Sequence, residues 1–161
     1  MLPMMARMAM GTIVALGLSS PSFDAGRPIP RRFTCEGANV APELSWEGAP
    51  PGTRSFALVV EDPDAPGGTF IHWVVYDLPA DARALREGTL PAGARQGRND
   101  FGKTRYGGPC PPPGPAHRYH FRLYALDRTL DVAAGATADE LRRAMSGHVL
   151  AEGQLIGTFG R

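Results

Sequence analysis

Glycine and proline occur so often in this chain that they limit the folds it can adopt. Glycine occurs 20 times and proline 16 times among the 161 residues. Both destabilise the interior of an α-helix, glycine through its conformational freedom and proline through its missing N–H and its ring. The sequence therefore excludes a helical bundle or a coiled coil and predicts a loop-rich, mostly β domain.

The balance of apolar and charged residues predicts one folded domain. Apolar residues make up 43 % of the sequence, and the formal net charge is +1. A chain of this length buries a sizeable core without disulfides or metals. Nucleic acids and anionic membranes select strongly basic surfaces, so neither is a predicted partner.

The first 17 residues differ from the rest, so we predict a single domain over residues 18–161. Residues 1–17 are rich in methionine and alanine, with Arg7 before a short, interrupted apolar stretch that lacks a clear cleavage site. We expect a disordered extension or a start codon placed too far upstream, with a weak signal peptide as the alternative.

The N-terminal stretch also bears on the predicted compartment. It is too short and too mixed to span a bilayer, so no integral membrane segment is expected. The sequence predicts a cytoplasmic protein. The alternative is a periplasmic or secreted protein, if residues 1–17 act as a signal.

Three apolar runs predict the core strands. Residues 55–61 read SFALVVE, residues 70–78 read FIHWVVYDL, and residues 119–126 read YHFRLYAL. The first run is continuously apolar, which is typical of a strand covered on both faces, and the third alternates. Strict alternation in the second run would place His72 and Trp73 on opposite faces.

One clear helix is predicted near residues 138–152, before a last strand at residues 154–159. Thr137 and Glu140 have the spacing of a capping box, in which two side chains satisfy N–H groups at a helix start. Leu141 and Met145 follow at helical spacing. Residues 79–115 contain many glycines and prolines and show no periodicity, and a connection of that length is usually functional.

Carboxylates and an imidazole lie close together around the first two strands. Asp62 and Asp64 belong to a DPDAP turn, whose prolines restrict the backbone on either side of Asp64. His72 follows after a short turn, so a hairpin would return it beside an aspartate. Alternatively, the aspartates form an ordinary Asx-type turn and His72 is a satisfied core residue.

The segment YGGPCPPPG at residues 106–114 is followed by His117 and Tyr119. Glycine allows the main chain to approach a ligand closely, and proline stiffens the loop so that less entropy is lost on binding. Because proline has no N–H, an anion bound here would depend on side chains such as His72 and His117 and on a few amides. The alternative is a rigid surface loop.

The two cysteines, Cys35 and Cys110, allow one disulfide at most, and the sequence leaves open whether they pair. We expect a structural or incidental role for Cys110 and a small packed hydrophobe at Cys35. A disulfide between them would require export of the chain.

Six segments appear in an order and spacing that match a known family. They are FTCEGANVAPELSW, DPDAP, HWVVYDLPA, YGGPCPPPG, HRYHFRLYALD and GHVLAEGQLIGTFGR. On these segments, across residues 18–161, the chain resembles the phosphatidylethanolamine-binding protein family, in its shorter bacterial and archaeal branch of Raf-kinase-inhibitor-like proteins.

The resemblance implies a central antiparallel sheet, a second small sheet, a few short helices, and a pocket for phosphate-like anions at one end of the sheet. Eukaryotic members have a further C-terminal helix at this pocket, which this sequence lacks. The resemblance implies no cofactor, metal or catalytic residue. The ligand-binding residues that it implies are Asp62, Asp64, His72, Gly108, Pro109, Cys110, Pro111, His117 and Tyr119.

The predicted function is non-enzymatic binding of a small anion or a phosphorylated head group, with regulation of an unknown protein partner, such as its inhibition. Because two carboxylates would repel a phosphate, we expect one aspartate to orient a histidine and the other to accept a hydrogen bond from the ligand.

The first alternative function is a hydrolase that uses Asp62, His72 and His117, although no nucleophile motif is present. The second alternative is a protease inhibitor that acts through the exposed proline-rich loop. The oligomeric state, a homodimer included, stays open.

Overall fold

The three predicted core strands pair side by side in one large sheet of the computed structural model, which describes residues 13–161. The strand order is β1-β9-β8-β4-β5-β7, and every neighbouring pair is antiparallel except the parallel pair β1 and β9. The predicted antiparallel sheet is therefore a mixed sheet with one parallel pair at its edge. Its strands are β1 (Val14–Ala15), β4 (Ser55–Asp62), β5 (Phe70–Pro79), β7 (Arg95–Gln96), β8 (His117–Leu126) and β9 (Val149–Phe159).

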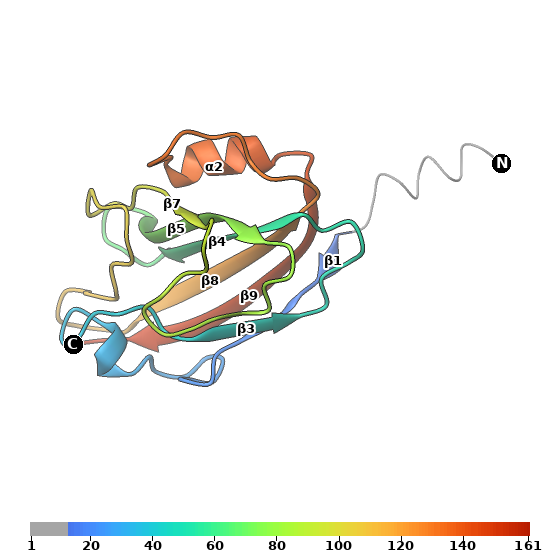
Figure 1. Ribbon diagram of the computed structural model, residues 1–161. Helices are drawn as coiled ribbons and strands as arrows, with labels where there is room; N and C mark the ends of the chain where they lie inside the picture. The colour runs from blue at the N-terminus through green and yellow to red at the C-terminus, as the bar shows by residue number, and fades with distance from the viewer. Residues whose placement is uncertain (1–12) are drawn as a thin grey trace.

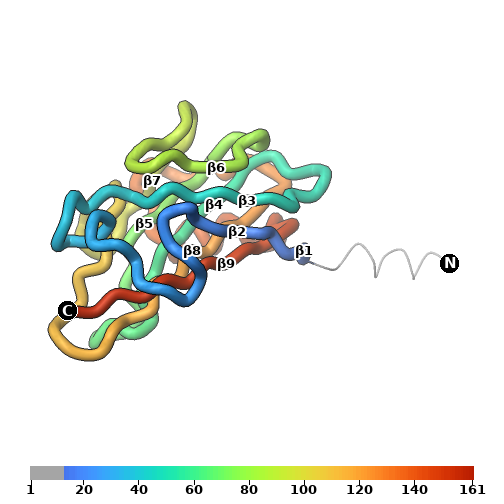
Figure 2. The backbone as a smooth tube through the Cα atoms, turned by 90° about the horizontal axis from the view of Figure 1, so that it is seen from below, coloured from blue at the N-terminus to red at the C-terminus, as the bar shows by residue number. Residues whose placement is uncertain are grey.

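A second sheet and a helix cover opposite faces of the large sheet, with α2 above it and β3 below it in Figure 1. The small sheet is antiparallel in the order β2-β3-β6, and Figure 2 shows it in front of the large sheet. Every residue of β4 is buried, as its continuous apolar run predicts. The mostly β prediction is confirmed. The small sheet consists of β2 (Gly17–Ser19), β3 (Leu44–Glu47) and β6 (Ala84–Leu85).

The domain begins earlier than residue 18. β1 pairs with β9, and the N–H of the buried Leu16 donates to the carbonyl of Glu152 at 2.7 Å. Residues 14–17, which the sequence assigns to an extension, therefore pack with the domain. The expectations for residues 1–12 lie outside the described residues.

Residues 13–161 contain two short helices, the 3₁₀ helix η1 (Arg31–Phe33) and α2 (Ala138–Met145). The capping box of α2 is confirmed, since Thr137 Oγ1 accepts the Glu140 N–H at 3.2 Å and Glu140 Oε1 accepts the Thr137 N–H at 3.0 Å. Neither helix within residues 13–161 has the length and apolar character needed to cross a membrane.

The predicted end of the helix at residue 152 is wrong. α2 stops at Met145, and Gly147 then adopts a φ of 83°, which reverses the chain. Val149 pairs with Leu126, and β9 continues along the whole of β8 from there. Pairing with the exposed edge of β8 satisfies backbone groups along the strand, and this outweighs the helical spacing of residues 146–152.

A β-bulge at His72 changes which way its side chain points. Val60 pairs with Trp73, but Glu61 pairs with Ile71, so His72 is the extra residue on β5. Trp73 packs in the core between the two sheets, whereas Ile71 packs against the core under α2. His72 lies with its ring 5.3 Å from that of Tyr119, a member of the core between the sheets. The prediction of opposite faces for His72 and Trp73 is therefore wrong, because a bulge shifts the alternation.

The capping box predicts a measurable contribution of Thr137 to stability. Thr137→Ala removes the acceptor for the Glu140 N–H, so we expect urea denaturation to show a loss of about 1 kcal/mol. Thr129→Ala is the matched control, because Thr129 is exposed and its hydroxyl has no hydrogen bond within residues 13–161. Equal stability of the two variants would contradict the role of the cap.

Candidate functional site

Three strands of the large sheet bring polar side chains to one end of it. Asp62 ends β4, His72 lies near the start of β5, and His117 and Tyr119 begin β8. Because β4 runs antiparallel to both of its neighbours, its last residue lies beside the first residues of β5 and β8. The four side chains surround a cavity of about 180 Å³.

Six of the nine predicted site residues line this cavity: Asp62, His72, Cys110, Pro111, His117 and Tyr119. The other three, Asp64, Gly108 and Pro109, lie outside its lining. The structure thus brings together acid, imidazole and proline residues from β4, β5, β8 and the glycine-proline loop.

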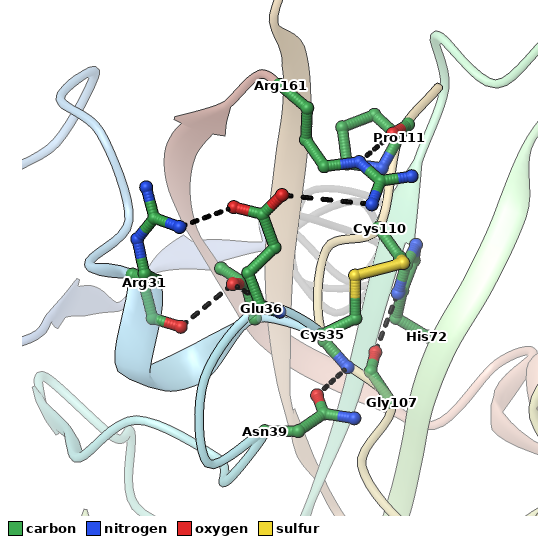
Figure 3. Close-up of a disulfide and its surroundings, with 11 residues drawn as sticks. Arg31, Cys35, Glu36, Asn39, His72, Gly107, Cys110, Pro111 and Arg161 are labelled. Atoms are coloured by element: carbon green, nitrogen blue, oxygen red, sulfur yellow. Dashed lines mark hydrogen bonds and ion pairs between the residues drawn. A yellow bond between two sulfur atoms is a disulfide. The ribbon is translucent and has the colours of Figure 1, made fainter. Parts of the chain in front are cut away.

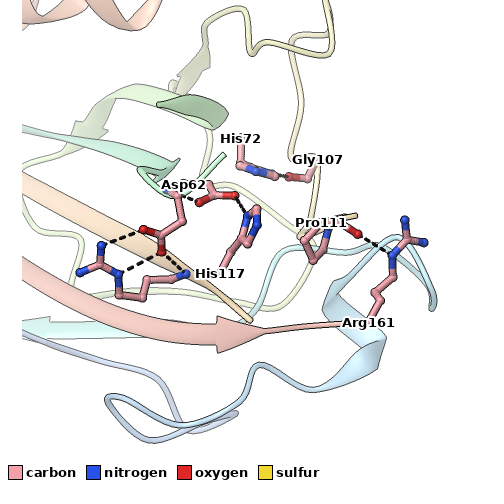
Figure 4. Close-up of polar contacts among 8 residues, drawn as sticks. Asp62, His72, Gly107, Pro111, His117 and Arg161 are labelled. Atoms are coloured by element: carbon pink, nitrogen blue, oxygen red, sulfur yellow. Dashed lines mark hydrogen bonds and ion pairs between the residues drawn. The ribbon is translucent and has the colours of Figure 1, made fainter. Parts of the chain in front are cut away.

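Asp62 orients His117. Oδ2 of Asp62 lies 2.6 Å from Nδ1 of His117, and Oδ1 accepts the N–H of Asp64 at 2.8 Å (Figure 4). Asp62 is only 3 % exposed, and each of its carboxylate oxygens accepts a hydrogen bond from a group of the protein. With Nδ1 committed to Asp62, Nε2 is the ring atom that His117 can offer to a ligand.

His72 is held as a neutral imidazole. Its Nδ1 lies 2.6 Å from the carbonyl oxygen of Gly107, and since a carbonyl only accepts, Nδ1 carries the proton. Burial lowers the pKa of His72 below its usual range, and the Gly107 carbonyl and the Asp62 charge oppose this only in part. Nε2 of His72 is consequently a hydrogen-bond acceptor near neutral pH.

Asp64 has a role other than the expected one. Its carboxylate accepts hydrogen bonds from Nε and Nη2 of Arg118, at 3.0 and 2.8 Å, and from the Arg118 N–H at 2.9 Å. These bonds hold the pKa of Asp64 well below its usual range. Asp64 is engaged by Arg118 through both oxygens and lies outside the cavity lining, so the structure lends no support to the hypothesis that the second aspartate accepts a hydrogen bond from the ligand.

The hydroxyl of Tyr119 is buried without a partner. Tyr119 is 1 % exposed, and no group of residues 13–161 forms a hydrogen bond with its Oη. Burial raises the pKa of this hydroxyl, and the nearby carboxylates of Asp62 and Asp64 raise it further. A buried hydroxyl without a partner loses its hydration and is uncommon in proteins unless a ligand or water completes it.

A disulfide between Cys35 and Cys110 fastens the glycine-proline loop to the turn after η1 (Figure 3). Two hydrogen bonds accompany it, from the Cys35 N–H to the Pro109 carbonyl at 3.0 Å and from the Gly108 N–H to Asn39 Oδ1 at 2.8 Å. The expectation that Cys35 is a packed small hydrophobe is therefore wrong. Gly108 and Pro109 take part in the hydrogen bonds that attach the loop to this turn, and they do not line the cavity.

Gly108 has a steric reason to be glycine. A Cβ atom there would lie 2.2 Å from the carbonyl oxygen of Phe33. On the far side of the loop, Nε of Arg161 donates to the Pro111 carbonyl at 2.6 Å. The cavity wall is thus held by the turn after η1 and by the last residue of the sequence.

The predicted site residues did not include two aromatic residues of the cavity lining. Phe70 and Phe101 line the cavity, with their ring centroids 4.8 Å apart, and Phe101 also lies 5.4 Å from His72. Phe70 begins β5 directly opposite Asp62, so strand pairing could have indicated it. Phe101 comes from the irregular segment, where no local pattern signals its position.

These features define a two-sheet β protein with a cavity at one end of its large sheet, where an acid, two histidines and a tyrosine lie among aromatic and proline residues. The family model described as phosphatidylethanolamine-binding protein matches residues 19–160 of the chain. The chain therefore belongs to this family, and the resemblance stated from the sequence is confirmed.

Similar proteins occur in archaea and bacteria. A UPF0098 protein of Methanothermobacter thermautotrophicus is 47 % identical over 151 residues, which cover 91 % of this chain and 99 % of that protein. The “Putative lipoprotein LppC” of Mycobacterium tuberculosis is 42 % identical over 145 residues, covering 89 % of this chain and 72 % of that protein.

Two solved structures are similar over nearly the whole chain. CT736 of Chlamydia trachomatis has a TM-score of 0.86 and 41 % identity, covering 91 % of this chain and 98 % of that one. YbcL of Escherichia coli, described as a member of the mammalian PEBP family, has a TM-score of 0.86 and 32 % identity, covering 92 % and 99 %.

The disulfide predicts a large loss of stability on its removal. The bond closes a loop with a sequence separation of 75 residues. Restricting such a loop in the unfolded chain contributes about 4 kcal/mol. Urea denaturation of the Cys35→Ser/Cys110→Ser double variant should show this loss, and reduced wild-type protein should match the variant. An unchanged midpoint in both samples would contradict the contribution.

The pKa of His72 predicts a pH-dependent stability. Between its usual value of 6.5 and its lowered value in the fold, the unfolded chain binds a proton that the folded chain does not. The free energy of unfolding therefore falls as the pH drops below 6.5, by at most about 1.4 kcal/mol per pH unit. It levels off once the folded protein also binds the proton.

His72→Gln isolates this contribution, because it removes the titration and keeps a polar side chain. Urea denaturation between pH 7.5 and pH 5 should show a smaller loss of stability in the variant than in the wild type. Parallel profiles for the two proteins would contradict the assignment to His72.

Proposed function

We propose that the chain is a non-enzymatic binding protein whose cavity holds a phosphate-type anionic group. The observation that carries the proposal is the Tyr119 hydroxyl, which is buried without a partner beside a histidine that Asp62 orients. Membership of the phosphatidylethanolamine-binding protein family supports a binding role for this cavity.

The cavity offers a set of groups that suits a partly protonated phosphate. The Tyr119 hydroxyl and the Cys110 N–H are candidate donors, and no hydrogen bond within residues 13–161 uses that N–H. His117 gives its Nδ1 proton to Asp62, so its Nε2 accepts in the neutral ring and donates only in the imidazolium form. Neutral His72 accepts a hydrogen bond from a P–OH group through Nε2. When His72 is protonated, the same atom donates to a phosphate oxygen instead.

The two carboxylates are compatible with an anion because both are already partnered. The Asp62 carboxylate accepts hydrogen bonds from His117 and from a backbone N–H, and the Asp64 carboxylate forms an ion pair with Arg118. A carboxylate in such bonds repels a nearby phosphate less than an unpaired one would. The ammonium of an ethanolamine phosphate would reduce the remaining repulsion.

A protein partner would meet the ligand at the rim of the cavity. Phe101 is 44 % exposed and lies at this rim, against Phe70 and His72. An exposed aromatic side chain beside a ligand site supports contact with a partner whose binding depends on whether the cavity is occupied. Regulation of that partner, such as its inhibition, would follow from this contact.

The disulfide bears on the compartment. Disulfides persist in oxidising compartments and are rare in the cytosol of most organisms. The Cys35–Cys110 bond therefore supports export, the alternative to the predicted cytoplasmic location. The lipoprotein name of the Mycobacterium tuberculosis relative agrees with this alternative.

Hydrolysis is the second candidate function, favoured by the 2.6 Å contact between Asp62 and His117. A carboxylate that orients a histidine is the usual arrangement of a general base. Cys110, which carries the one thiol-type sulfur in the lining, has that sulfur in the disulfide, and the lining formed by residues 13–161 contains no serine or threonine. Binding is for this reason preferred to catalysis.

Calorimetry with inorganic phosphate and with phosphoethanolamine tests the proposal between pH 5.5 and 8.5. We expect affinity to rise as the pH falls, because protonated His72 donates a charged hydrogen bond to a phosphate oxygen, which neutral His72 cannot do. Tyr119→Phe removes one hydrogen bond to a charged group and should weaken binding about tenfold. His72→Ala should weaken it and flatten the pH dependence.

His148→Ala is the control, because His148 pairs with Asp127 away from the cavity. Absence of binding by the wild type, or equal affinity in all variants, would contradict the proposal. A phosphatase and esterase screen separates the second candidate. Turnover that disappears in His117→Ala would replace binding with hydrolysis.

A further inference from the structure

A second cavity adjoins the first. It has a volume of about 300 Å³ and shares two of its lining residues, Phe101 and Cys110, with the first cavity. Its other lining residues include Lys103 and Arg105, from the irregular segment between β7 and β8. The two cavities thus lie on either side of one wall, which carries the disulfide and an exposed aromatic ring.

The second cavity is positively charged. Lys103 and Arg105 line it, and no acidic residue does. Neither cation has an ion-pair partner within residues 13–161. The acids on the neighbouring segments are engaged elsewhere: Glu36 pairs with arginines of η1 and of the C-terminal end, and Asp100 accepts the N–H of Ile71.

A buried asparagine fixes the loop that carries the two cations. Asn99 is 3 % exposed, and its Oδ1 accepts the N–H groups of Phe101 and Lys103 at 3.0 and 2.9 Å. Its Nδ2 donates to the carbonyls of Arg105 and His72 at 2.8 and 3.2 Å. The backbone under both cations is therefore preformed and anchored to β5 at His72, which lowers the entropy lost when a ligand binds.

We propose that the second cavity binds the second anionic group of a ligand whose first anionic group occupies the first cavity. The ligand class is a molecule with two phosphate-type groups joined by a short linker that passes Phe101 and Cys110. This inference rests on the proposed function of the first cavity. Unpaired lysine and arginine charges are the usual partners of such a group, because phosphate oxygens accept their charged hydrogen bonds.

Inorganic phosphate, pyrophosphate and tripolyphosphate form a series of probes of increasing length. We expect calorimetry to show at least about tenfold tighter binding of tripolyphosphate than of inorganic phosphate. Lys103→Gln/Arg105→Gln should abolish most of this gain and leave the affinity for inorganic phosphate within about twofold. Arg54→Gln/Arg128→Gln is the matched control, since it removes two positive charges at a separate surface hollow.

The sequence provides a direct readout of occupancy, because Lys103 is its only lysine. Acetylation by an N-hydroxysuccinimide ester, followed by mass spectrometry, therefore reports on this side chain, with the terminal amine as an internal reference. Tripolyphosphate should slow the acetylation of Lys103 in the wild type, whereas inorganic phosphate at the same occupancy should not. His72→Ala should weaken that protection, because the two cavities act on one ligand.

The outcomes separate the inference from the proposed function. If inorganic phosphate does not bind the wild type, the proposed function fails. The inference is overturned if inorganic phosphate binds through His72 but tripolyphosphate binds no tighter than inorganic phosphate. It is also overturned if Lys103→Gln/Arg105→Gln and the control Arg54→Gln/Arg128→Gln keep the same gain in affinity for tripolyphosphate, because the second cavity is then not a subsite. Full protection of Lys103 by tripolyphosphate in His72→Ala would also overturn it, because the second cavity would then bind alone.

Discussion

The antiparallel pairing of β4 with both β5 and β8 is the constraint on which the rest of the structure depends. It brings the last residue of one strand beside the first residues of two others, so Asp62 meets His72 and His117 although 55 positions separate Asp62 from His117. The pairing also buries β4 completely, between the small sheet and α2. A polar cluster at the end of such a strand is held by the whole core, so it can stay ordered without a ligand.

The loop that closes the cavity depends on contacts from outside the sheet. The disulfide and the Asn39 side chain hold the glycine-proline loop from the turn after η1, and Arg161 holds it from the C-terminal end. The prolines of this loop have no N–H groups, so its attachment depends on the few remaining amides, such as that of Gly108, and on groups from elsewhere in the chain. The same loop separates the two cavities, which makes its rigidity relevant to both of them.

The chemistry of the site follows from which side chains are already partnered. Arg118 engages Asp64 fully, and Asp62 is committed to His117, so neither acid faces a ligand with an unpaired charge. Tyr119 is the opposite case, since its hydroxyl is buried and has no partner in the described part of the chain. The contrast between satisfied acids and an unsatisfied hydroxyl supports the ligand position proposed above, which residue type alone would not do.

The sequence by itself determined the three core strands, the capping box at Thr137 and the family, because periodicity, cap spacing and ordered motifs are local signals. Only the tertiary structure decided the bulge at His72, the early end of α2, the pairing of Cys35 with Cys110 and the position of Phe101 beside His72. Each of these depends on a partner far away in the sequence. The direction of a side chain in a bulge or a loop is set by that partner, and no spacing along the chain encodes it.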